Sequence, residues 1–508
     1  MFPRALPRRI RRAGRCALSV SGAALALLAL FACAGAGDEA SRACVLHHNL
    51  IEDNHILLER EPALVAGKLR KMVSSPFLFL RGTARLFVED ALDPAGPVFL
   101  PTAYGSFAGS RVLTTGDAHP ENFGTYLSGD GTLLVDFNDF DTAAFGPWWL
   151  EVRRLAVGWS VAGRMLEERA GAQEATRIRL ARSAVRGYLH EIRALERGEE
   201  PVAVEEGGEV GVVFADLIRR SRRDGDILEE LDDFTRLDPD TGARRIFIGD
   251  IRPPGEDGVY DSTLAPVSEA ERRMVERMIA RYRHTLHDAH AFPAEMFRVK
   301  GVARRLGAGV GSYPILRYYV LLEGPTDSPD DDWVIDMKEA VPATRYPGHS
   351  LYPRRSFENA AQRVVWMTRA FHVHPDNDPL LGWAHEGNLG FHMQSRTKYQ
   401  KNLDVERMID RLRRTGGGRW TTGDILEAAF LTGRILARGH ALAPTLDGPP
   451  GLGAIVAALG DDDEGFERET LRFAVRYAPF VFDDTEHLRV LLEEHGPLLG
   501  FRPSAPPR

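Results

Sequence analysis

Apolar residues recur with helical spacing over most of the chain, and two short apolar runs interrupt this pattern. Helices are predicted at residues 56–73, 76–92, 147–159, 175–195, 213–222, 268–288, 356–373 and, with interruptions, 403–494. Ser268 and Glu271 form the sequence signature of a capping box at the start of one of these helices. The two apolar runs, Val112-Leu113 and Leu133-Leu134-Val135, predict brief buried strands.

A different pattern occupies residues 297–338. Its segments alternate apolar and polar residues or are continuously apolar, with glycines between them, at 297–306, 318–322 and 333–338. This pattern is typical of a small antiparallel sheet, and residues 380–395 are also predicted to be extended. The predicted fold class is therefore α+β, with a small antiparallel sheet lobe and a large helical lobe.

These changes of pattern divide the chain into four predicted parts. Residues 1–36 form a signal or lipoprotein segment, and residues 45–292 form a helical lobe that contains the polar unit at 111–141. Residues 293–396 form the sheet lobe, and residues 397–508 supply C-terminal helices that complete the large lobe.

Composition limits the class of protein. The chain has 508 residues, of which 44% are hydrophobic and 27% are charged, as in globular proteins. Its formal net charge of −8 argues against a dedicated nucleic-acid binder, which is usually basic. No nucleic-acid partner is therefore expected.

The N-terminus predicts export. An arginine-rich segment precedes the apolar run at 17–32, which is short for a membrane span. The run ends in Leu30-Phe31-Ala32-Cys33, which resembles a lipoprotein signal with a lipidated cysteine. We expect a protein of the cell envelope, attached to the membrane through Cys33, or otherwise periplasmic. Cys16 lies in the signal, so Cys44 would be the single other cysteine, which excludes a disulfide framework and a thiolate zinc site.

A polar unit at residues 115–141 follows the ends of the two predicted strands. It contains Asp117, His119, Glu121, Asn122, Asp136, Asn138, Asp139 and Asp141. Carboxylate and amide oxygens gathered at strand ends are the ligands that a hard cation such as Mg²⁺ requires. The alternative is a polar hairpin loop capped by Asp and Asn.

A phosphate-binding segment is predicted later in the chain. The candidates for cofactor binding are Gly307, Gly309, Gly311, Ser312, Lys338 and Glu358. Glycines between two strands permit close approach of the backbone to phosphate. Lys338 ends a strand, faces Asp136 in this interpretation, and could pair with Glu358 on the next helix. The alternatives are an ordinary hairpin turn and a solvated lysine at the sheet edge.

The spacing Asp117-x-His119-Pro120-x-Asn122, followed by a strand that contains Asp136, resembles the catalytic centre of protein-kinase-like and aminoglycoside-phosphotransferase-like enzymes. The resemblance implies that Asp117 is the catalytic base and that Asn122 and Asp136 are metal ligands. His119 is also predicted to be catalytic, and Asp139 or Asp141 could substitute for Asp136 as a metal ligand, since all three lie close in sequence. The resemblance also implies Mg²⁺ or Mn²⁺, and ATP or another nucleotide, as cofactors. The glycine turn and Lys338 follow the catalytic segment, whereas in kinases they precede it. The implied kinase-like fold is therefore circularly permuted.

Several motifs together resemble the bacterial family called domain of unknown function 2252. They are GDAHPENFG, VDFNDFD, GPWWLEVRRLA, RYYVLLEG and MKEA, and the resemblance covers residues 72–480. The family is grouped with kinase-like folds by similarity, and its substrate is not established.

The preferred interpretation is metal-dependent phosphoryl or nucleotidyl transfer to an unknown small-molecule or protein acceptor. One alternative is a kinase-like lipoprotein that binds a ligand without turnover, because exported proteins meet little ATP. The other is a metal-dependent phosphohydrolase, because Gly116-Asp117-Ala118-His119 is similar to the first metal-binding segment of metallophosphoesterases.

Overall fold

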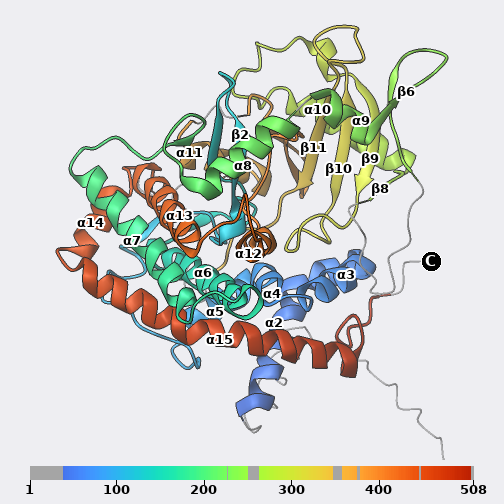
Figure 1. The fold of residues 1–508 in the computed structure, drawn as a ribbon. Coiled ribbons are helices and arrows are strands. Elements are labelled where there is room, and N and C mark those ends of the chain that lie inside the picture. Colours follow the sequence, from blue (N-terminus) through green and yellow to red (C-terminus); the bar gives the residue numbers. More distant parts are fainter. Residues whose placement is uncertain are drawn as a thin grey trace, which may run out of the picture.

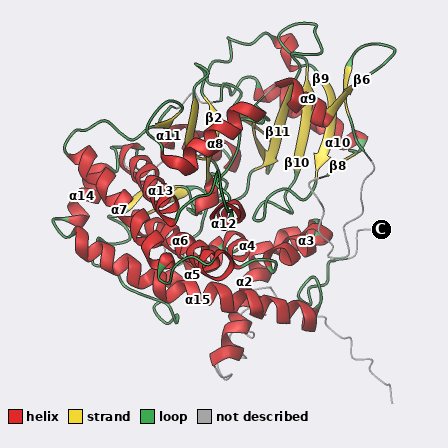
Figure 2. Cartoon of the chain, in the orientation of Figure 1, coloured by secondary structure: helices red, strands yellow, loops and turns green. Residues whose placement is uncertain are grey.

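The computed structural model describes residues 38–225, 227–249, 263–346, 357–374, 378–445 and 448–504. The predicted signal at 1–36, with Cys33, lies outside the described residues. Helices fill the lower part of the molecule in Figure 1, and the largest sheet lies above them at the right. Figure 2 shows the same division between helices and strands. The predicted α+β class with small antiparallel sheets is confirmed.

Over the residues described from 38 onward, the helices before the first strand are α2 (Asp38–Arg60), α3 (Pro62–Met72), α4 (Pro76–Gly82) and α5 (Ala84–Leu92). The apolar pattern predicts two helices over most of this stretch, at 56–73 and 76–92. Pro62 explains the break between α2 and α3, because a proline has no N–H to continue a helix and is favoured in the first turn of a new one. A second unpredicted break, at Thr83, separates α4 from α5. Ser75 also caps α4, with its hydroxyl accepting from the N–H of Phe77 at 3.2 Å.

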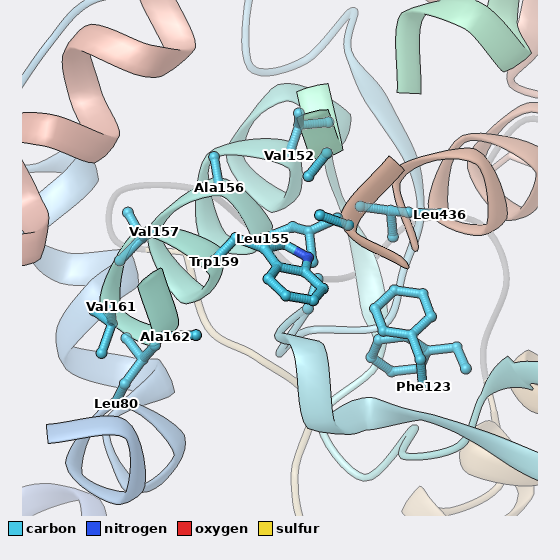
Figure 3. Close-up of a cluster of buried hydrophobic side chains, with 14 of the residues drawn as sticks. Leu80, Phe123, Val152, Leu155, Ala156, Val157, Trp159, Val161, Ala162 and Leu436 are labelled. Atoms are coloured by element: carbon cyan, nitrogen blue, oxygen red, sulfur yellow. The ribbon is translucent and has the colours of Figure 1, made fainter. Parts of the chain in front are cut away.

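The helical core is centred on α6 (Trp148–Ala170). This helix is buried on nearly every side, including its charged residues Glu151, Arg153 and Arg154, each of which has a partner. Figure 3 shows Leu155 and Trp159 of α6 with Phe123 and Leu436 from other elements. α6 packs against α7 (Thr176–Glu196), α12 (Val405–Arg413), α13 (Thr422–Leu442) and α15 (Asp463–His495), and also against α4 and α5, whereas α8 (Gly211–Asp224) and α14 (Leu452–Leu459) pack against α13.

Glycines allow α7 and α13 to pack closely. A Cβ atom added to Gly433 would lie 1.9 Å from the carbonyl oxygen of Ala184. We therefore expect Gly433→Ala to lower the free energy of unfolding by about 1–3 kcal/mol, because the two backbones must separate. Chemical denaturation measures this change. Gly453→Ala is the control, since no atom lies within 4 Å of a Cβ there, and an equal loss in both variants would contradict the prediction.

Two small strand units carry the polar unit. β1 (Arg111–Thr114) pairs antiparallel with β4 (Ala144–Pro147). β2 (Phe123–Leu127) pairs with β3 (Leu133–Phe137), which also pairs with β5 (Val204–Glu205). The predicted strands at 112–113 and 133–135 are confirmed. A short helical turn, η1 (Pro120–Asn122), lies between β1 and β2.

The large sheet has the strand order β12-β13-β11-β10-β9-β8, and all neighbouring strands are antiparallel. The strands are β8 (Leu264–Ala265), β9 (Val299–Arg305), β10 (Arg317–Leu322), β11 (Trp333–Glu339), β12 (Gly382–Glu386) and β13 (Leu389–Ser395). The turn η2 (Ala294–Phe297) precedes β9, and α11 (Ala360–Phe371) precedes β12. The predicted strands of this region are confirmed.

The two faces of the large sheet are covered by different elements. α10 (Glu269–Tyr282), which begins with the predicted capping box, packs on the face that contains Val320 and Ile335. α9 (Ile227–Phe234) and the hairpin of β6 (Thr235–Leu237) and β7 (Arg244–Ile246) lie against the face that contains Tyr319, Leu321 and Val334. α9, α10 and the β6–β7 hairpin precede residue 293, where the predicted sheet lobe begins, but they pack on the large sheet.

Cys44, on α2, is disulfide-bonded. The sequence predicts Cys44 as the single cysteine left after processing at Cys33, without a disulfide; the disulfide at Cys44 contradicts this prediction. Its partner lies outside the described residues. Among the helices that the structure describes, none is long and apolar enough to cross a bilayer.

Candidate functional site

Asp117 follows β1 and is held by an arginine of the core helix α6. The Nε and Nη2 atoms of Arg154 donate to Asp117 Oδ1 at 3.0 and 2.7 Å. Burial raises the pKa of Asp117, and the charge of Arg154 acts in the opposite direction. A carboxylate with these properties can accept a proton from a hydroxyl that is placed beside it.

The backbone before Asp117 is fixed by Glu151. The carboxylate of Glu151 accepts from the N–H groups of Thr115 and Gly116 at 2.9 and 2.7 Å, and from the Thr115 hydroxyl at 2.5 Å. His440 Nε2 lies 2.8 Å from the same carboxylate and connects it to α13. Gly116 has φ +88°, and a Cβ there would lie 2.5 Å from the Thr142 carbonyl oxygen. Two core helices therefore position the loop that carries Asp117.

His119, the second predicted catalytic residue, lies beside Asp117 but is buried. Its Nε2 atom is 3.6 Å from Asp117 Oδ2, and its ring meets Phe77 edge-on at 5.9 Å. Burial, together with the charges of Arg81 and Arg154, lowers the pKa of His119 well below its usual value. The imidazole lies beside the Asp117 carboxylate, just beyond hydrogen-bond distance.

The predicted metal ligands are not all brought together. Asn122 Nδ2 donates to the carbonyl oxygen of Asp117 at 2.9 Å, so its side chain braces the loop. Asp136 is fully buried; it forms an ion pair with Arg438 and accepts from the N–H groups of Phe137 and Val373 at 2.8 and 3.2 Å. Asp136 thus faces the helical core and not Lys338.

Lys338, at the end of β11, meets the two aspartates that follow β3. Its Nζ atom is 2.5 Å from Asp141 Oδ2 and 3.9 Å from Asp139 Oδ1. Burial and the charge of Asp141 raise the pKa of Asp139. Burial acts to lower the pKa of Lys338, but the charges of Asp139 and Asp141 act against it, and the pKa of Lys338 is raised. Burial is the main cause of the raised pKa of Asp117, and the charge of Asp139 adds to it. The expected contact of Lys338 with Asp136 is replaced by contacts with Asp139 and Asp141.

The loop of Asp141 is clamped to the sheet by Arg363 of α11. Arg363 Nη2 donates to the carbonyl oxygens of Asp141 and Val341 at 2.8 and 2.7 Å, and Nη1 donates to that of Ala143. Glu358 lies before α11, is exposed, and is not a partner of Lys338. The predicted pair of Lys338 and Glu358 is therefore not formed.

The predicted glycine turn lies over α3, close to the same region. Gly307 and Gly309 have φ +72° and +80°, which glycine adopts without strain. Lys71 Nζ donates to the Gly309 carbonyl oxygen at 2.9 Å, and a Cβ at Gly311 would lie 3.7 Å from the Arg81 carbonyl oxygen. Ser312 donates to the carbonyl oxygen of Ala308 at 3.3 Å, which closes the turn.

Asp139 and Asp141 are the carboxylates at this site that could hold a cation. Over the residues that the structure describes, no group of three or more His, Cys, Asp or Glu side chains is arranged to hold a metal ion. Mg²⁺, however, usually binds through one or two carboxylates together with substrate phosphates and water. Asp139 and Asp141 provide two neighbouring carboxylates of this kind.

A separate pocket of about 280 Å³ lies at the other end of β11. Its walls include Tyr126, Leu231, Val334, Arg396 and Tyr399. It lies where the chain leaves β13 and enters the segment before α12.

The comparisons with known proteins identify the family. The family model for uncharacterized proteins conserved in bacteria, DUF2252, matches residues 60–489. The chain belongs to DUF2252. No curated protein and no solved structure matches this DUF2252 chain.

Sequence reasoning missed several residues that build the site of this DUF2252 chain. Glu151, Arg154 and Arg363 hold the loops of the acidic side chains, and all three are buried. A signal for two of them was present, because Glu151 and Arg154 stand among large apolar residues in GPWWLEVRRLA, and charged residues that become buried are usually paired. No signal in the sequence indicated that Arg363 contacts the Asp141 loop.

Proposed function

We propose that this DUF2252 protein is a phosphotransferase with kinase-like chemistry. The observation that supports this best is the contact of Lys338 with Asp139 and Asp141, and the charge of Asp139 also acts on the pKa of Asp117. Lysine from a sheet and carboxylates from a loop are the groups that phosphoryl transfer uses for positioning and for neutralising charge.

The order of elements in the sheet also supports the proposal. A glycine turn joins β9 and β10, Lys338 lies on the next strand, and α11 follows. Protein kinases likewise have a glycine-rich loop, a lysine on the third strand and a helix after it. Because these elements follow Asp117 in this chain, a circularly permuted kinase-like fold belongs to the proposal.

Each residue then has a chemical role. Asp117 accepts the proton of the acceptor hydroxyl, and Arg154 holds its carboxylate in place, with His119 beside it. Lys338 binds phosphate oxygens of the donor. Asp139 and Asp141 would hold Mg²⁺, which neutralises the charge of the phosphates when it is bound. Asn122 and Glu151 keep the Asp117 loop in position.

A thermal-shift experiment with the purified protein tests the ligand half of the proposal. We expect Mg²⁺ with a triphosphate to raise the melting temperature by several degrees, because a ligand that binds the folded state stabilises it. Asp139→Asn should remove the part of the shift that depends on Mg²⁺. Asp240→Asn, an exposed site on the β6–β7 hairpin, is the matched control. The same shift in both variants contradicts the proposed role of Asp139.

A further inference from the structure

Basic side chains form a row across the strands beside the glycine turn. In the sheet register, Arg317 of β10 lies opposite Lys338 of β11. Tyr318 lies opposite Arg304, so the next step of this register brings Arg305 of β9 beside Arg317. Directly paired residues project from the same face of a sheet. Arg305, Arg317 and Lys338 therefore form one row, here called the basic row.

Two of the three side chains of the basic row are paired with carboxylates of the described chain, and Arg305 is not. Lys338 meets Asp139 and Asp141, and Arg317 donates to both carboxylate oxygens of Asp336. For Arg305, the described part of the chain provides no carboxylate partner: its guanidinium lies 5.3 Å from the centre of the Tyr319 ring, and its buried Nε atom has no acceptor.

Like charges that lie opposite each other destabilise a sheet. Burial, and then the nearby charge of Arg317, lower the pKa of Arg305, which reflects this cost. An external anion would offset it. Arginine presents a planar fork of N–H donors that matches phosphate oxygens. Since neighbouring strands are separated by nearly 5 Å, the row extends over about 10 Å, which is longer than a single phosphate.

The sheet face beyond the basic row is occupied by the chain itself. Leu231 of α9 is buried against Tyr319, Leu321 and Val334. Phe234 meets the Tyr319 ring edge-on at 4.9 Å. The row therefore borders charged groups and a filled surface, and the pocket at Val334 lies at the opposite end of β11. Among the described residues, those recorded beside the row itself are Tyr319 and charged side chains, so this part of the face offers contacts to phosphate.

We propose that the basic row binds a chain of linked phosphates as the phosphoryl donor, without recognition of a base. This inference rests on the proposed function. In the transfer step, the bond between the terminal phosphorus and its bridging oxygen breaks, and its electron pair stays on the shortened phosphate chain. The acceptor oxygen bonds to phosphorus, and its proton moves to Asp117. Inorganic polyphosphate and a nucleoside triphosphate share this chemistry.

Isothermal titration calorimetry on the purified protein with Mg²⁺ tests the inference, with tripolyphosphate, ATP and orthophosphate as probes. Tripolyphosphate and ATP should bind with similar affinity, and orthophosphate at least about tenfold more weakly. Arg305→Gln should weaken tripolyphosphate binding by about 10- to 100-fold, as expected for loss of a charged hydrogen bond. Arg304→Gln is the matched control, because Arg304 is the adjacent residue and pairs with Glu61.

Several outcomes overturn the inference. They are binding of ATP without binding of tripolyphosphate, binding of neither, or an equal loss in Arg304→Gln and Arg305→Gln. If Arg305→Gln does not fold, the comparison of the three probes on the unaltered protein still decides. The test measures binding without turnover. If tripolyphosphate binds normally but no donor supports transfer, only the proposed function is refuted. If ATP supports transfer and Arg305→Gln does not change that rate, only the inference is refuted.

Discussion

Replacement of Asp117 by asparagine is expected to reduce the rate of phosphoryl transfer by a factor of about 10²–10⁴, the usual contribution of a positioned general base. Asparagine has nearly the same shape, but it cannot accept the hydroxyl proton. Ligand binding should be retained, because Lys338, Asp139 and Asp141 remain. The measurement is the initial rate of transfer from a labelled triphosphate or tripolyphosphate to acceptor, together with calorimetric binding of the same donor.

The control for this experiment is Asp410→Asn, an exposed position on α12. Circular dichroism of the Asp117→Asn variant should match that of the unaltered protein, even though Arg154 loses an ionised partner. A variant that is folded and transfers phosphate at the normal rate would show that Asp117 is not the base. A variant that loses binding and transfer together would assign Asp117 to the donor site instead.

The sequence predicted the elements of the fold well where a single pattern dominates. α7 and the three central strands of the large sheet occupy the predicted ranges, because their periodicity is set by one buried face. The break between α2 and α3 was missed because the apolar pattern runs through it. β2 and β4 were also missed. They are short, and their pairing is decided by tertiary contacts that no local pattern records.

The candidate site was predicted in part. Gly311 of the glycine turn lies beside Arg81, which pairs with Glu121 of the Asp117 loop, and Lys338 meets Asp141, although these residues are far apart in the chain. The sequence could not decide which of Asp136, Asp139 and Asp141 faces the sheet. In an extended segment successive side chains alternate in direction, so the choice depends on how β3 ends. The structure places Asp136 in the core and the other two aspartates beside Lys338.

The ion pair of Asp136 and Arg438 leads to the largest expected change in stability. Both side chains are almost completely buried, and Arg438 Nη1 also donates to the Val202 carbonyl oxygen at 3.0 Å. Arg438→Met should lower the free energy of unfolding by about 3–5 kcal/mol, because it leaves a buried carboxylate without its partner. Urea denaturation measures this loss. Arg472→Met, at an exposed position on α15, should change stability by less than about 0.5 kcal/mol.

A double-mutant cycle separates a structural role of Asp136 from a role as a metal ligand. In the variant with both Asp136→Asn and Arg438→Met, no buried charge remains, so the combined loss of stability should be smaller than the sum of the two single losses. The coupling should be the same with and without Mg²⁺, because the carboxylate faces Arg438 and not Lys338. Simple additivity would contradict the pairing. A coupling energy that changes with Mg²⁺ would indicate that Asp136 is a metal ligand. An unchanged coupling energy leaves Asp139 and Asp141 as the carboxylates available to a cation.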